Sequence, residues 1–238
     1  DRSFFLNHEY KKYFRKTSLK QKDIGNLFLK EIFFKKPKNF LEVGVFHGVT
    51  ARNVCELLYS IHKDQFKYIG VDLFGENEGN VNEIIPNTVF SNPFKQIYFK
   101  YIIRQDPYSL EAVERLLKKF KDNIELIKGN SNKVLKTIDM SKIDYAFIDG
   151  GHQYLTVKND LLNVEEIIKN NGTILCDDYD LTYAPGVKKA IDEFVTSNNY
   201  KVEILFNRFA KITKNWFLMQ LKKQINKSNK SKTIFFYL

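Results

Sequence analysis

The chain has 238 residues and a formal net charge of +10, with 38 Lys and Arg against 28 Asp and Glu. This length suits one domain with a full core, and a hydrophobic fraction of 43% excludes an intrinsically disordered chain. No apolar run approaches the ~18 residues that a membrane span needs. Two cysteines, Cys55 and Cys176, are too few for a disulfide framework. We therefore expect a soluble protein of the cytoplasm.

The positive charge lies at the two ends of the chain. Residues 1–38 carry a net charge of +7 and residues 201–238 carry +8, whereas residues 39–200 carry −5. Basic termini could grip the phosphates of a nucleic acid, but an acidic middle segment would repel them. We therefore do not expect nucleic acid as the main partner.

The chain alternates short apolar runs with longer periodic stretches, a pattern typical of βα units around a parallel sheet. An amphipathic helix over residues 19–34, capped by Thr17 or Ser18, is predicted before the first strand. Five strands are then predicted at residues 39–43, 68–73, 124–127, 145–148 and 173–176. Helices are predicted at residues 50–61, 109–120, 133–138, 155–169 and 185–197.

The pattern changes at two places. Apolar segments at residues 202–206 and 216–221 follow one another without a helix, which predicts an antiparallel hairpin. Residues 75–108 lack a clear period but are rich in aromatic side chains, so we expect an ordered lid or substrate-facing insertion. A dimer interface or a purely structural segment is the alternative. The predicted fold class is α/β, with a doubly wound, mostly parallel seven-stranded sheet that ends in an antiparallel hairpin.

Polar and glycine residues follow the first three predicted strands. Gly44 and Gly48 lie in the turn after the first strand, where open α/β sheets bind ligands, although a tight turn alone also explains two glycines. Asp72 ends the second strand, where a carboxylate can accept hydrogen bonds from ribose hydroxyls. Asn130 and Ser131 follow the third strand and could either contact an adenine edge or simply cap a helix.

Acidic residues follow the next two strands. Asp149 closes the fourth strand, and Asp177 and Asp178 close the fifth. Because neighbouring parallel strands lie ~4.8 Å apart, we expect these carboxylates to converge. Carboxylates that converge repel one another unless a proton or a cation is bound, and oxygen ligands favour Mg²⁺, Ca²⁺ or Mn²⁺ over zinc. Acids that only cap helices or face water are the alternative.

A histidine, His152, lies three residues after Asp149, beyond two glycines. An imidazole has an ordinary pKa of ~6.5, so it can act as a general base beside a hydroxyl that a cation activates. A histidine that only packs or forms a hydrogen bond is the alternative. His47, inside the glycine turn, could also touch a ligand.

On these residues the sequence resembles the class I S-adenosylmethionine-dependent methyltransferases over roughly residues 39–221, which implies a Rossmann-like fold. The motifs that carry the resemblance are Glu42-x-Gly44-x-x-x-Gly48-x-Thr50, Asp72, Gly129-Asn130-Ser131, Asp149-Gly150-Gly151-His152 and Asp177-Asp178. The last two motifs are similar to those of the metal-dependent sugar O-methyltransferases that tailor macrolide and aminocoumarin antibiotics. Residues 75–108 do not align with those enzymes, which leaves the acceptor open.

The resemblance implies a role for each motif. Residues at the methionine part of S-adenosylmethionine would be Glu42, Gly44, Gly48 and Thr50, while Asp72 would hold the ribose and Asn130 and Ser131 would flank the adenine. A divalent ion, Mg²⁺, would be held by Asp149, Asp177 and Asp178, with Asp149 also at the cofactor. His152 would take the proton of the acceptor.

The function expected from the resemblance is methyl transfer to a hydroxyl of a sugar, either a nucleotide sugar or a sugar of a surface polysaccharide or natural product. Three alternatives remain open: a catechol-type acceptor, RNA held by the basic ends, and a cofactor-binding module without activity. We expect a basic helical extension at residues 1–38, a methyltransferase unit at 39–221 and a basic tail at 222–238. The apolar end of the tail favours packing on the domain or a homodimer.

Overall fold

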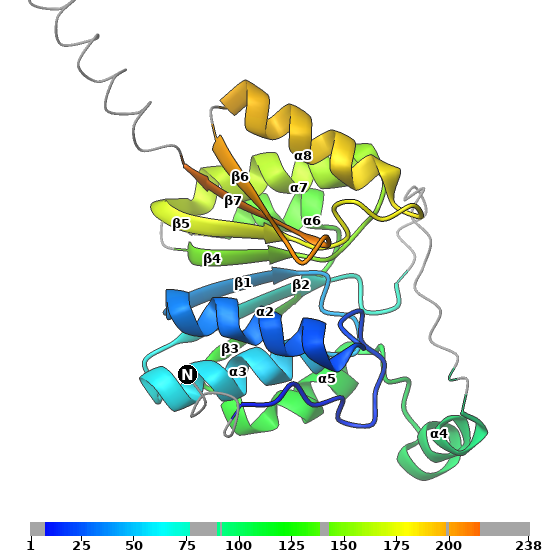
Figure 1. The fold of residues 1–238 in the computed structure, drawn as a ribbon. Coiled ribbons are helices and arrows are strands. Elements are labelled where there is room, and N and C mark those ends of the chain that lie inside the picture. The colour runs from blue at the N-terminus through cyan, green and yellow to red at the C-terminus, as the bar shows by residue number, and fades with distance from the viewer. Residues whose placement is uncertain (1–7, 77–89, 91, 139–142, 199, 215–238) are drawn as a thin grey trace, which may run out of the picture.

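The computed structural model describes residues 8–76, 90, 92–138, 143–198 and 200–214. Its strands form one sheet in the order β3-β2-β1-β4-β5-β7-β6 (Figure 1). Their bounds are Asn39–Val43 for β1, Lys67–Asp72 for β2, Ile124–Lys128 for β3, Ile143–Ile148 for β4, Ile168–Cys176 for β5, Tyr200–Leu205 for β6 and Phe209–Lys214 for β7. Strands β1 to β5 are parallel, and β7 runs antiparallel to both β5 and β6. The predicted fold class is confirmed.

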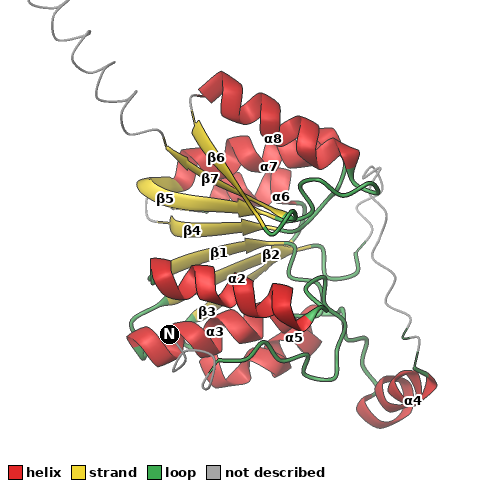
Figure 2. Ribbon diagram, in the orientation of Figure 1, coloured by secondary structure: helices red, strands yellow, loops and turns green. Residues whose placement is uncertain are grey.

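Helices cover both faces of this sheet (Figure 2). One face carries α2 (Lys22–Lys35), α3 (Val49–His62) and α5 (Leu110–Leu117), which a 3₁₀ turn, η2 (Lys118–Phe120), continues. The other face carries α6 (Ser131–Val134), the 3₁₀ turn η3 (Leu135–Thr137), α7 (Tyr154–Ile167) and α8 (Pro185–Asn198). Successive strand residues point to opposite faces, so Phe40 and Leu41 belong to different cores.

The N-terminal helix α2 packs into the hydrophobic core on the face of the sheet that α3 and α5 also cover. Phe28, Leu29 and Ile32 are buried, and the ring of Phe28 lies 4.6 Å from that of Phe147 in β4. The predicted caps are wrong, because the N-cap of α2 is Gln21 and neither Thr17 nor Ser18 caps it. Ser18 instead lies at the carboxyl edge of the sheet.

The terminal hairpin is present, but its second strand lies earlier than predicted. The strand is Phe209–Lys214, whereas the predicted segment at residues 216–221 lies outside the described residues. A tight turn connects the two strands: Phe206 and Asn207 both have positive φ angles, and the Arg208 N–H donates to the Leu205 carbonyl at 3.1 Å. Two positive φ angles match the right-handed twist of paired strands, as in a type I′ turn.

The described part of the segment at residues 75–108 includes one helical stretch. It contains α4 (Pro93–Ile97) and a π-helical turn, η1 (Tyr98–Ile103), and α4 lies away from the sheet in Figure 1. The rings of Phe90 and Phe99 stack at 5.1 Å, and both side chains are buried. These rings and the basic residues Lys100 and Arg104 line a pocket of about 310 Å³. Within the described residues no helix is long and apolar enough to cross a membrane.

Candidate active site

The candidate site lies where the strand order reverses. β1 is flanked by β2 on one side and by β4 on the other, and the chain builds outward from this point in both directions (Figure 1). The carboxyl ends of β1, β2 and β4 lead into Gly44, Asp72 and Asp149. Ligands of open α/β sheets bind at such a switch point, so the sequence motifs meet where a ligand is expected.

Packing accounts for both glycines of the turn after β1. Gly44 has a φ of +96°, and a Cβ there would lie 2.2 Å from the backbone oxygen of Asp149. Gly48 has a φ of +72° as the N-cap of α3, and a Cβ there would lie 2.8 Å from Val113 in α5. Gly44 therefore brings the end of β1 directly against the end of β4, so the glycine turn and Asp149 belong to one site.

The carboxylate of Asp72 accepts three hydrogen bonds. The Phe46 N–H donates to Oδ2 at 2.7 Å, and the Phe74 N–H and the Tyr108 hydroxyl donate to Oδ1 at 2.9 and 2.8 Å. Burial and the neighbouring Asp72 charge raise the pKa of Tyr108, so its hydroxyl remains a donor. Asp72 thus ties the glycine turn to β2, and Tyr108 was not among the predicted site residues.

Two further predicted residues near the glycine turn have protein partners. Glu42 is buried and accepts a short hydrogen bond from the Tyr68 hydroxyl, and burial raises its pKa to about 8. The Thr50 hydroxyl lies 2.8 Å from that of Tyr10. His47 is fully buried, and burial together with the charge of Arg15 lowers its pKa to about 3, so it is neutral.

Asn130 and Ser131 begin helix α6. Asn130 is the N-cap, and its side-chain oxygen accepts a hydrogen bond from the Asn132 N–H at 3.0 Å. Asn130 therefore caps α6, and its place after β3 still leaves an adenine contact as a prediction. Ser131 is the first residue of α6, next to the end of β3.

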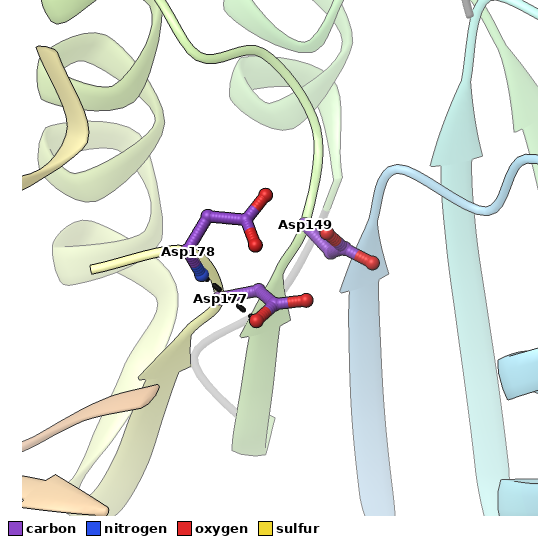
Figure 3. Close-up of side chains that lie close together, drawn as sticks. All are labelled: Asp149, Asp177 and Asp178. Carbon is purple, nitrogen blue, oxygen red and sulfur yellow. Dashed lines mark hydrogen bonds between the residues drawn. The ribbon is translucent and has the colours of Figure 1, made fainter. Parts of the chain in front are cut away.

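The three predicted acids converge at the ends of β4 and β5. Asp149, Asp177 and Asp178 each offer a carboxylate oxygen within 4.8 Å of the others, and the side chains lie side by side in Figure 3. The Asp178 N–H donates to Asp177 Oδ1 at 2.8 Å. Burial, and then the two neighbouring carboxylates, raise the pKa of Asp149 well above its usual range. Carboxylates this close together are not all charged unless a cation lies between them, so the arrangement suits either a bound proton or a bound cation.

His152 joins this cluster through Asp178. Its Nε2 lies 2.9 Å from Asp178 Oδ2, and its side chain is 45% exposed, so the imidazole bridges the buried acids and the surface. Tyr183 packs near the imidazole, with ring centroids 5.8 Å apart, and it also forms a hydrogen bond with Asp178. Although burial alone would raise it, these hydrogen bonds and the charge of Arg208 lower the pKa of Asp178.

Two residues of the cluster were missed by the sequence analysis. Ser18 donates a hydrogen bond to Asp149 Oδ2 at 2.6 Å, and Arg208 forms ion pairs with Asp177 and Asp178. Both come from segments far from the acids in the sequence. The strand-end pattern that revealed the acids carries no signal for either residue.

Known proteins resemble the chain over this same region. A family model described as a methyltransferase domain matches residues 41–179, more than half of the chain. An uncharacterized protein of Acanthamoeba polyphaga mimivirus is 27% identical over 168 residues, covering 63% of this chain and 71% of that protein.

Solved structures share the fold. The O-methyltransferase NovP superposes with a TM-score of 0.60 at 17% identity, covering 80% of this chain and 81% of its own. The Podospora anserina methyltransferase PaMTH1, solved with bound S-adenosylhomocysteine, gives 0.56 at 18% identity over 82% and 79%. CalS11, a TDP-rhamnose 3′-O-methyltransferase, gives 0.53 at 15% identity over 79% and 77%. With the family match and the sheet order, the chain belongs to the methyltransferase-domain family and has the fold of the class I S-adenosylmethionine-dependent methyltransferases.

Proposed function

We propose that this protein transfers a methyl group from S-adenosylmethionine to a hydroxyl group of a sugar, with a divalent cation at Asp149, Asp177 and Asp178 and with His152 as the general base. The observation that carries the proposal is the contact between His152 and Asp178 inside the three-carboxylate cluster. The tight packing of Gly44 on Asp149 supports it, because the cofactor turn and the cluster then share one wall.

The donor set fits a hard divalent cation. Three carboxylates gather with ligand atoms within 4.8 Å of one another, and Asp178 Oδ1 is buried and accepts no hydrogen bond, although Arg208 Nη2 lies 3.3 Å from it. Oxygen-only ligands of this kind suit Mg²⁺ or Mn²⁺. A divalent cation bound there would supply Lewis-acid polarisation of the acceptor hydroxyl.

His152 is assigned the proton transfer. With Asp178 accepting from Nε2, Nδ1 of the same ring takes the hydroxyl proton as the new C–O bond forms and the S–CH₃ bond breaks. The hydrogen bond between His152 Nε2 and Asp178 orients the imidazole ring, and the Asp178 carboxylate stabilises the imidazolium that results. The remaining rate enhancement comes from holding the two reactants in line.

At the cofactor end, Asp72 is assigned to the ribose hydroxyls. The turn after β1, with Glu42, Gly44, Gly48 and Thr50, is assigned to the methionine part, and Asn130 and Ser131 to the adenine. These assignments follow the strand ends at the switch point. We assign the reaction to the unit at residues 39–221, with α2 contributing to its core.

A sugar is proposed as acceptor because the Asp149-Gly150-Gly151-His152 and Asp177-Asp178 motifs resemble those of sugar O-methyltransferases. In addition CalS11, one of the proteins of similar fold, is a TDP-rhamnose 3′-O-methyltransferase. A screen for transfer of a labelled methyl group should therefore include nucleotide sugars, catechols and bulk RNA, each with and without EDTA. We expect EDTA-sensitive transfer to a nucleotide sugar.

The matched variants for this screen are His152→Ala and His62→Ala. His62 is partly exposed at the end of α3, far along the chain from the carboxylates, and its Nε2 lies 3.1 Å from the Lys36 carbonyl oxygen, so its loss should leave transfer unchanged. Loss of the base should lower turnover ~100-fold or more and remove the acid limb of the pH–rate profile. Full activity of His152→Ala would refute the base, and full activity in EDTA would refute the cation.

A further inference from the structure

Arg208 reaches the three-carboxylate cluster from the hairpin turn between β6 and β7. Its Nε lies 2.5 Å from Asp177 Oδ1 and its Nη2 lies 2.6 Å from Asp177 Oδ2, which is a two-pronged ion pair. Nη2 is also 3.3 Å from Asp178 Oδ1. The Arg208 side chain is 16% exposed, and those of Asp177 and Asp178 are 1% and 6% exposed, so this contact is largely screened from water.

The backbone fixes Arg208 in this position. The tight turn at Phe206 and Asn207 places Arg208 directly before β7, and its carbonyl accepts a hydrogen bond from the Tyr179 N–H at 2.8 Å. Tyr179 follows the two aspartates, so the turn is attached to the same loop whose carboxylates the guanidinium binds. The ion pair is therefore a built feature and not the chance contact of a surface side chain.

The position of Arg208 affects any cation at the cluster. A guanidinium that binds both oxygens of a carboxylate forms a strong, directional pair. It contacts both oxygens of Asp177, one of the three acids of the cluster. A divalent cation that uses Asp177 must share these oxygens with the guanidinium and sits close to its positive charge, which repels it.

We propose that Arg208 is a positioning residue that serves as the resident counter-charge of the Asp149, Asp177 and Asp178 cluster and thereby weakens the binding of a divalent cation there. This inference rests on the cation site of the proposed function. It assigns Arg208 a separate effect, which is to hold Asp177 in place and to keep the bound cation exchangeable.

The test is Mn²⁺ binding to the purified full chain, measured by the electron paramagnetic resonance signal of free Mn²⁺. In Arg208→Gln, which removes the charge, the dissociation constant for Mn²⁺ should fall at least tenfold. Arg208→Lys keeps the charge but cannot bind both oxygens of Asp177 in the same way, so its affinity should lie between those of the wild type and the Gln variant. The matched control is Arg115→Gln, an exposed arginine of α5, which should bind Mn²⁺ as the wild type does.

The outcomes separate this inference from the proposed function. Mn²⁺ binding that is tightest in Arg208→Gln, intermediate in Arg208→Lys and weakest in the wild type supports the inference. Equal or weaker binding overturns it and leaves the cation site intact, whereas no Mn²⁺ binding by any protein overturns both. If Arg208→Gln does not fold, the test uses Arg208→Lys. Mn²⁺ binding to this variant that is no tighter than to the wild type contradicts the inference.

Discussion

The hydroxyl of Ser18 donates a 2.6 Å hydrogen bond to Asp149, which joins two residues 131 positions apart in the chain. The segment before α2 carries Ser18 to this place, and other contacts hold it there. The Tyr10 hydroxyl lies 2.7 Å from that of Thr17, and Arg15 donates to the His47 carbonyl at 3.2 Å. The N-terminal segment is therefore part of the wall of the site.

The first prediction concerns this hydrogen bond. Ser18→Ala removes the donor and leaves Asp149 Oδ2 without it, so we expect the free energy of unfolding to fall by ~1–2 kcal/mol. The control is Ser60→Ala, because Ser60 is exposed and its hydroxyl donates only within its own helix, to Leu57. Urea denaturation at pH 7 measures both. Equal losses in the two variants would show that the Ser18 contact contributes nothing specific.

A second prediction concerns the pH dependence of stability. The pKa of Glu42 is raised from 4.5 to about 8 by burial, so the folded chain keeps a proton that the unfolded chain releases. The contribution of this group to stability is complete below pH ~4.5 and is lost as the pH rises toward 8, at up to ~1.4 kcal/mol per pH unit. Glu42→Gln should therefore flatten the decline in stability between pH 5 and 8.

Urea denaturation at several pH values tests this prediction by the difference between the two proteins. Burial also raises the pKa of Asp149, which adds a decline of the same sign, but that group is present in the wild type and in the variant. The difference in slope therefore belongs to Glu42. Parallel curves would contradict a protonated Glu42.

The acids of the site could be predicted from the sequence because each follows directly on an apolar strand. Asp72, Asp149 and Asp177 needed only the strand pattern, and the parallel sheet then brought them to one edge. Ser18, Tyr108 and Arg208 could not be found in this way. Their positions depend on where an irregular segment or a hairpin turn packs, and no local period records that.

The last strand shows the same limit. The apolar run at residues 216–221 predicts a strand, whereas Phe209–Lys214 is interrupted by Lys211, Thr213 and Lys214. The structure buries Phe209, Ala210 and Ile212 between β5 and β6, because the turn at Phe206 and Asn207 sends the chain back at once. Turn geometry, rather than total hydrophobicity, therefore places Phe209–Lys214 in the sheet.

A third prediction tests the ribose assignment. Asp72→Asn removes the negative charge that would accept hydrogen bonds from the ribose hydroxyls, so the dissociation constant for S-adenosylhomocysteine should rise at least tenfold. Asp122→Asn, at an exposed position before β3, should bind as the wild type does. Titration calorimetry gives both constants, and a thermal scan checks that the variant is folded. Unchanged affinity in a folded Asp72→Asn protein would remove Asp72 from the cofactor site.

The fourth prediction uses two glycines on either side of one contact. Gly44→Ala places a Cβ 2.2 Å from the Asp149 backbone oxygen at a φ of +96°, so strain and overlap together should lower the free energy of unfolding by ~3 kcal/mol or more. Gly150→Ala meets only ordinary contacts at 3.6 Å and has no positive φ, so its cost should stay within ~1 kcal/mol.

Because the clash in Gly44→Ala forces the ends of β1 and β4 apart, this variant should also lose affinity for S-adenosylhomocysteine, whereas Gly150→Ala should keep it. Denaturation curves and titration calorimetry on the two proteins measure both effects. If Gly44→Ala were as stable as Gly150→Ala, the two strand ends would not be in the close contact on which the shared wall of the site depends. If it were destabilised but bound the ligand normally, Gly44 would serve the packing of the sheet alone.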